Sequence, residues 1–224
     1  MASNESTQPA KSPDPGPNSG VTRRSFLKHV GAAAVVSEGL LAARPAAAQE
    51  APATPAASSE DGVLRGPQQI KLTINGKDRA VSVEPRTTLL SALRDRLEPA
   101  VTGPKLVCDA GTCGACTVLV DGKTAYGCSL LAIDMVGRKI TTVEGLGTPD
   151  NLSPVQAAFC EKDAMMCGFC TSGFVTSVTG LLMKNPNPTH EQIQEGCKGN
   201  FCRCGTFPHI FEAAKTAAEA MGKK

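Results

Sequence analysis

Apolar and polar residues alternate along the segment that begins near Gln69. Ile70, Leu72 and Ile74 share one face, and the alternation resumes over 80–83 after Asn75-Gly76, the dipeptide most typical of a tight hairpin turn. A second hairpin is predicted from 117–120 and 123–125 around Asp121-Gly122, and 140–143 is a candidate last strand.

A helical period lies between the two predicted hairpins. Thr87 or Thr88 is the expected N-cap of a helix that runs to about Leu97. Its apolar face is formed by Leu89, Leu90, Leu93 and Leu97. Two hairpins around one helix predict a small mixed sheet of the ubiquitin-like (β-grasp), plant-ferredoxin sort.

The pattern becomes helical after Gly145. One helix is expected from Pro154 to about Lys162, a second over 172–184, and a third behind the capping box of Thr189 and Gln192. A fourth begins at Pro208 and carries an apolar stripe. The predicted fold class is therefore α+β: a ferredoxin-like domain followed by a four-helix bundle.

The first fifty residues have the layout of an export signal. A polar stretch leads to Arg23-Arg24 and Ser-Phe-Leu, then to a weakly apolar segment over 30–43 and the small residues of 46–48. The adjacent arginines favour the twin-arginine type over a basic tail with a chance Arg pair. We expect a signal and N-terminal tail at 1–48, a linker at 49–67, and domains at 68–146 and 147–224, with export to the periplasm.

Charge and composition exclude some classes of function. The formal net charge is +2 and 41% of residues are hydrophobic, which indicates a folded protein without the basic surface of a nucleic-acid partner. The sequence contains no apolar run long enough to cross a membrane. The ten cysteines are the feature that points to chemistry.

One set of cysteines has a specific spacing. Cys108, Cys113 and Cys116 are followed at a distance by Cys128, which is the plant-type spacing for a [2Fe–2S] cluster. Gly111 and Gly114 allow the loop to wrap closely around such a cluster. This set is therefore predicted to hold a first cluster.

The second set is two short pairs, Cys167 with Cys170 and Cys202 with Cys204, each beside a predicted helix. From spacing alone, four thiolates suit zinc as well as iron–sulfur. A disulfide scaffold is disfavoured, because Cys202 and Cys204 are too close in sequence to bond each other easily.

Two cysteines, Cys160 and Cys197, match no ligand position in either set. We expect them to be ordinary buried thiols rather than partners in a disulfide bond.

With these motifs, the chain from about Gln69 to Ala217 resembles the iron–sulfur subunit of the xanthine oxidase and aldehyde oxidoreductase (molybdenum hydroxylase) family. The matching segments are CDAGTCGACTVLVDGK, TVEGL, CGFCTSGF and GNFCRCG. The resemblance implies two [2Fe–2S] clusters, with Cys108, Cys113, Cys116 and Cys128 binding the one distant from molybdenum, and Cys167, Cys170, Cys202 and Cys204 binding the nearer one. It also places Cys204 and Met166 beside the pterin of the molybdenum cofactor.

The sequence departs from the family pattern at three places, which affects how far the family's residue roles apply to this chain. Met166 stands where many members have Gln, Ser172 replaces the commoner Pro, and CRCGTF replaces CRCTGY. The last two resemble a subgroup that contains both flavin-containing and flavin-free enzymes, so the electron acceptor stays open.

The resemblance implies an electron conduit with no substrate site of its own. Electrons would pass from the molybdenum cofactor of a large partner subunit through both clusters to an FAD subunit or a cytochrome. Aldehydes are the expected substrates, with purines and N-heterocycles as alternatives. The rival function is a free-standing ferredoxin-like carrier, although such carriers are usually strongly acidic.

Overall fold

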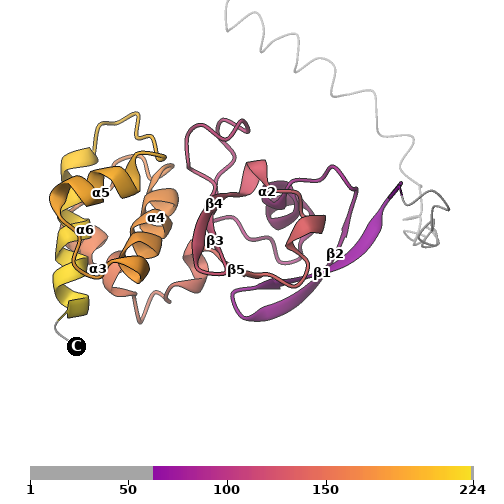
Figure 1. The fold of residues 1–224 in the computed structure, drawn as a ribbon, viewed down its shortest axis with the longest axis horizontal. Coiled ribbons are helices and arrows are strands. Elements are labelled where there is room, and N and C mark those ends of the chain that lie inside the picture. Colours follow the sequence, from indigo (N-terminus) through magenta and orange to yellow (C-terminus); the bar gives the residue numbers. More distant parts are fainter. Residues whose placement is uncertain (1–62, 223–224) are drawn as a thin grey trace, which may run out of the picture. The chain divides into compact units, whose positions relative to one another are not determined.

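The computed structural model describes residues 63–222. The signal predicted at 1–48 and most of the predicted linker lie outside these residues. The first part of the described chain forms a five-stranded sheet in the order β2-β1-β5-β3-β4 (Figure 1). Its strands are β1 (Gln68–Ile74), β2 (Lys77–Val83), β3 (Thr117–Val120), β4 (Lys123–Tyr126) and β5 (Lys139–Thr141).

Both predicted hairpins are confirmed. Asn75 and Gly76 have φ angles of 51° and 76°, the left-handed pair that a tight primed turn requires, and they place Ile74 opposite Lys77. Asp121-Gly122 makes the same kind of turn between β3 and β4. Strand β5 runs parallel to β1 and antiparallel to β3, which joins the two hairpins into one sheet.

The helix between the hairpins is confirmed, and Thr88 caps it by accepting a hydrogen bond from the Ser91 amide. It begins as α2 (Leu89–Ser91) and continues with wider turns as η2 (Ala92–Arg96). Leu89 and Leu93 are fully buried in one core with Leu72 and Val83 of the sheet. These residues form the hydrophobic core of the ferredoxin-like domain.

The predicted last strand is shorter than expected. It ends at Thr141, and Val143 instead begins the 3-10 turn η5 (Val143–Gly145). The reason is a side-chain contact: Asn75 Oδ1 accepts the Thr142 amide at 2.9 Å, so the backbone leaves the ladder there. Two further 3-10 turns, η3 (Gly127–Ser129) and η4 (Ile133–Met135), connect β4 to β5.

Four helices follow, as predicted. They are α3 (Pro154–Glu161), α4 (Thr171–Lys184), α5 (His190–Cys197) and α6 (Phe207–Gly222). The Thr189–Gln192 capping box at α5 is confirmed, and Ser153 with Gln156 forms a second one at α3. Capping by these side chains satisfies helix amides that would otherwise lack partners.

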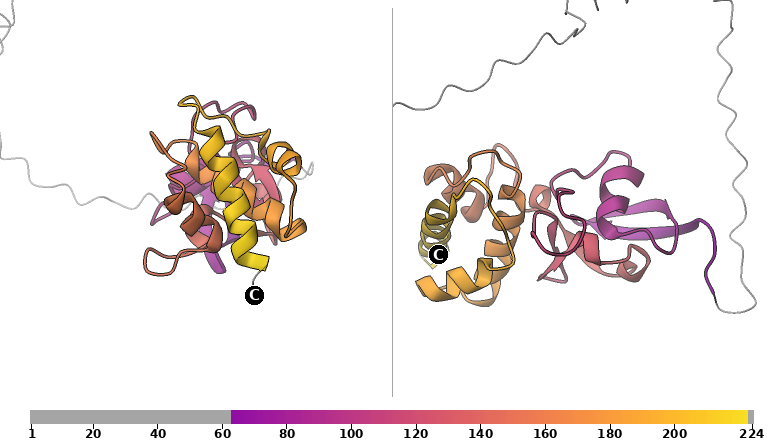
Figure 2. Two further views of the ribbon diagram at one scale, coloured as in Figure 1. Left: turned by 90° about the vertical axis from the view of Figure 1, so that its left-hand side faces the viewer. Right: turned by 90° about the horizontal axis from the view of Figure 1, so that it is seen from above.

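A second hydrophobic core joins these helices. Phe174 of α4 is fully buried and meets Phe207 edge to face, with ring centroids 5.8 Å apart. Ala213, Ala214 and Ala217 let α6 approach its neighbours closely, and α6 crosses the bundle in Figure 2. The predicted α+β class, with a ferredoxin-like domain before a helical one, is confirmed. None of the helices in residues 63–222 has the length and apolar character to span a membrane.

Candidate metal centres

The first cysteine set meets at the end of the β3–β4 hairpin. Cys108, Cys113 and Cys116 lie on the loop that leads into β3, and Cys128 lies on η3 just after β4. The Gly127 amide donates to the Cys116 carbonyl at 3.1 Å, which holds Cys128 next to Cys116. The sheet thus brings the distant fourth cysteine to the loop.

The loop conformation agrees with the role predicted for its glycines. Gly111 and Gly114 have φ angles of 67° and 69°, which side chains rarely adopt. The Ala110 amide points at Cys108 and donates to its Sγ at 3.4 Å. A loop that directs an amide at sulfur is suited to hold an anionic cluster.

The second set lies on two loops that each lead into a long helix. Cys170 is the N-cap residue of α4, and Cys202 and Cys204 come shortly before α6. The N-terminus of a helix carries partial positive charge, so both loops bring cysteines towards an electropositive helix end. Cys202 is buried, whereas Cys167 and Cys204 are exposed.

Within each set the thiols are arranged in pairs. Cys108 lies beside Cys113, and Cys116 beside Cys128, close enough for each neighbour to perturb a pKa. In the second set the pairs are Cys167 with Cys204 and Cys170 with Cys202. Each pair of the second set therefore combines one thiol from the loop of Cys167 and Cys170 with one from the loop of Cys202 and Cys204.

This pairing fits a binuclear centre. A [2Fe–2S] cluster takes two protein ligands on each iron, so its four thiolates do not converge on one point. The donor chemistry and the pairing suit iron–sulfur clusters at both sites.

The thiols of each centre differ in acidity. A hydrogen bond from Thr112 lowers the pKa of Cys108 to about 6. At Cys202 burial raises the pKa, but hydrogen bonds led by the one with Thr206 outweigh it and bring the value to about 7. Burial raises the pKa of Cys116 and that of Cys170 to about 12. Metal loading must therefore displace protons from the buried thiols, because a thiolate is the ligand.

Met166 lies on the surface, directly before Cys167, with 68% of its area exposed. Exposed Met165, Phe169 and Phe201 occur on the same cysteine loops. The exposed thiol of Cys204 is paired with Cys167, so Met166 and Cys204, the two residues expected at the pterin, belong to neighbouring parts of one surface.

The two remaining cysteines behave differently from each other. Cys197 is 2% exposed, as predicted, but Cys160 is exposed, so the expectation of two buried thiols is wrong for Cys160. On α3 the buried stripe is Val155, Ala158 and Phe159, and Cys160 follows it on the next, outward position. Both thiols are free.

Sequence reasoning missed Asn200. Its side chain is buried and makes three hydrogen bonds, two of which reach the first cysteine loop and its strand. Its position between Cys197 and Cys202 was visible in the sequence, but its partners come from segments that only the fold brings together.

Comparison with known proteins agrees with this reading of the two domains. Residues 72–138 match the family of 2Fe-2S iron-sulfur cluster binding domains, and residues 142–215 match the [2Fe-2S] binding domain family. The aldehyde oxidoreductase iron-sulfur-binding subunit PaoA of Escherichia coli is 43% identical over 215 residues, which cover 88% of each chain.

Two further relatives have other substrates in their names. The nicotine 6-hydroxylase small subunit of Paenarthrobacter nicotinovorans is 45% identical over 70% of this chain and 93% of its own. The crystal structure of quinoline 2-oxidoreductase from Pseudomonas putida 86 aligns with a TM-score of 0.66 and 39% identity, covering 70% of this chain and 97% of that one. With two cluster-binding domains in this order, the chain belongs to the iron–sulfur electron-transfer subunits of the xanthine oxidase and aldehyde oxidoreductase family, the molybdenum hydroxylases.

Proposed function

We propose that this chain carries electrons from the molybdenum cofactor of a larger partner subunit to FAD or a cytochrome, during the oxidation of aldehydes to carboxylic acids. The helical-domain centre receives the electrons and the ferredoxin-like centre delivers them. The observation that carries the proposal is the direct link between the two cysteine loops, where the Phe201 amide donates to the Cys113 carbonyl at 2.9 Å. Two centres whose ligand loops are bonded to each other suit a relay.

The surface around the second centre supports a macromolecular partner. Met165, Met166, Phe169 and Phe201 are each more than half exposed. Apolar side chains exposed together mark sites of association in soluble proteins. The proposed occupant is the molybdenum-cofactor subunit, which would cover these residues and reach the exposed Cys204.

Met166 limits the hydrogen bonds that this surface can offer to the pterin. A thioether cannot provide the amide hydrogen bonds that Gln offers at the equivalent place in many relatives. The pterin is therefore expected to take this hydrogen bond from another group or from water.

The aldehyde substrate and the periplasmic location are supported by two separate observations. The similarity to PaoA extends over most of both chains, and PaoA is named as an aldehyde oxidoreductase subunit. The Arg23-Arg24 segment has the pattern of a twin-arginine signal. We propose that the protein is exported already folded, with its clusters installed.

Purification of the native protein tests this function. The chain is expected to co-elute in size-exclusion chromatography with a much larger subunit, and the complex is expected to contain molybdenum and to oxidise an aromatic aldehyde with an artificial acceptor. Elution at the mass of this chain alone, without molybdenum, would favour the free-standing carrier.

A further inference from the structure

The two cysteine loops are joined by a short bonded connection. The Cys113 carbonyl accepts the Phe201 amide, and Phe201 is followed directly by Cys202. Cys113 and Cys202 are predicted ligands of different centres. A single hydrogen bond therefore separates the backbone of one ligand from the backbone next to the other.

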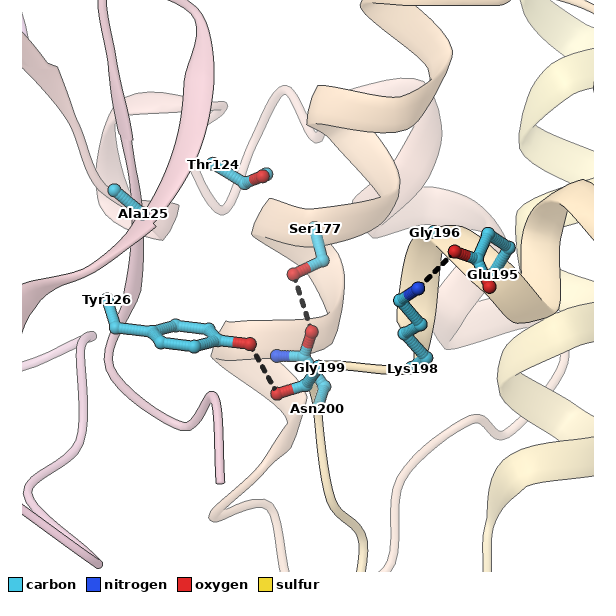
Figure 3. Close-up of a pocket in the computed structure, with 9 residues that line it drawn as sticks. All are labelled: Thr124, Ala125, Tyr126, Ser177, Glu195, Gly196, Lys198, Gly199 and Asn200. Carbon is cyan, nitrogen blue, oxygen red and sulfur yellow. Dashed lines mark hydrogen bonds and ion pairs between the residues drawn. The ribbon is translucent and has the colours of Figure 1, made fainter. Parts of the chain in front are cut away.

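Asn200 fixes this connection from the buried side. Its Nδ2 donates to the Gly114 carbonyl at 2.9 Å and to Thr117 Oγ1 at 3.2 Å. Its Oδ1 accepts from Ser177 Oγ at 2.7 Å, as Figure 3 shows. The carboxamide thus binds the first cysteine loop, strand β3 and helix α4 together, and it is itself only 6% exposed.

Close backbone packing leaves little freedom around Asn200. A Cβ atom at Gly173 of α4 would overlap the Gly114 carbonyl, and one at Gly114 would overlap the Gly199 carbonyl. Tyr126 of β4 donates from its hydroxyl to the Gly199 carbonyl at 2.8 Å (Figure 3). A side chain at Gly173 or Gly114 would therefore push the two loops apart.

An apolar cavity lies beside the same contact. It has a volume of about 200 Å³ and is lined by Cys113, Cys167 and Cys170 together with Val107, Ala115 and Phe201, among others. Ligand residues of both centres therefore face one space with mainly apolar walls. Cys113 and Phe201, which form the bonded connection, both line this space.

We propose that Asn200 is a positioning residue for electron transfer between the two centres. Its three buried hydrogen bonds keep the hydrogen bond between the Phe201 amide and the Cys113 carbonyl formed, and so keep the two cysteine loops connected. The proposal rests on the proposed function for the direction of transfer. One electron leaves one centre as the other gains it, and no bond or proton changes in this step.

Two substitutions open the contact in different ways. Asn200→Ala removes all three hydrogen bonds without adding charge. Gly173→Ala keeps Asn200 but inserts a methyl group against the Gly114 carbonyl, at a helix position where Ala is otherwise favourable. Matched controls are Asn185→Ala, which loses exposed hydrogen bonds to Gln192 and to the Asn187 amide, and Gly196→Ala, whose methyl group meets first the flexible Leu181 side chain.

The readouts are made on the native complex with both centres loaded. Iron and sulfide content and the separate EPR signals report whether each centre is intact. The magnetic splitting between the two reduced centres, and the rate of electron transfer after flash photoreduction, report their connection. Since a misplacement of about 1 Å can cost on the order of a hundredfold in a well-positioned step, we expect each test variant to slow transfer on the order of tenfold.

Both test variants are expected to keep full iron content and both EPR signals, but to show weaker splitting and slower transfer, while both controls match the wild type. Wild-type splitting and rate in Asn200→Ala and Gly173→Ala would overturn the proposal. If Asn200→Ala loses iron, Ser177→Ala, which deletes only the hydroxyl on Oδ1, takes its place, and a wild-type rate there would be equally contradictory. Failure of the proposed function would appear separately, as a missing large subunit with intact transfer between the centres.

Discussion

Phe174 offers a sharp test of whether the two centres depend on separate cores. Its ring is fully buried in the helical core, meets Phe207 edge to face, and its amide donates to the Cys170 carbonyl at 3.1 Å. Replacing a buried Phe by Ala costs about 3–5 kcal/mol, of which the aromatic pair accounts for about 0.5–1.5 kcal/mol. This is a large fraction of the roughly 5–15 kcal/mol that stabilises a folded protein.

The assay is anaerobic guanidinium unfolding of wild type and Phe174→Ala, followed by visible absorption and by the EPR signal of each centre. The helical-domain signal is expected to disappear at lower denaturant in the variant. The ferredoxin-like signal is expected to stay near its wild-type midpoint, because Leu72, Leu89 and Leu93 form a different core.

Met183→Ala is the matched control, since Met183 lies on the same helix with its side chain 58% exposed, and its change is expected to stay within about 0.5 kcal/mol. Equal loss of both signals in Phe174→Ala would refute the idea that each domain stabilises its own centre.

Four further outcomes are expected. Arg23→Lys combined with Arg24→Lys keeps the charge but is expected to leave the protein in the cytoplasm, because the export receptor reads the guanidinium groups; normal export by cell fractionation would contradict this. In the loaded protein at pH 8, iodoacetamide is expected to modify exposed Cys160 and spare Cys197, whose pKa burial raises to about 12; rapid labelling of Cys197 would show that it is accessible. Because that raised pKa lies above the ordinary value of 9.0, the stability that the neutral Cys197 thiol contributes is fully present below pH 9 and is lost as the pH rises towards about 12, which denaturation at several pH values would detect. Met166→Asp places an unpaired carboxylate in the proposed contact with the molybdenum subunit and is expected to reduce aldehyde turnover and disturb only the helical-domain EPR signal; unchanged turnover and signal would place Met166 away from the cofactor.

Local chemistry made much of the fold predictable. Asn75-Gly76 selects its turn by the φ angles it tolerates, and Thr189 with Gln192 caps a helix with side chains three residues apart. The spacing of Cys108, Cys113 and Cys116 predicted the first centre in the same way, whereas the spacing of the second set left zinc and iron–sulfur open until the family resemblance was considered.

Features that depend on distant partners were not predictable. Strand β5 ends early because Asn75, far away in sequence, binds the Thr142 amide. The pairing of Cys167 with Cys204 and of Cys170 with Cys202 depends on where two helices begin in space. The role of Asn200 depends on Gly114, Thr117 and Ser177, which only the folded chain brings together.

Each of the two cysteine sets is expected to hold one [2Fe–2S] cluster. The decisive measurement is iron, sulfide and zinc analysis of the purified protein together with EPR of the reduced form. Two [2Fe–2S] clusters predict about four iron and about four sulfide per chain and two distinguishable signals, of which Cys113→Ser removes one and leaves the other. Zinc with about two iron per chain, or the loss of both signals in Cys113→Ser, would contradict the account.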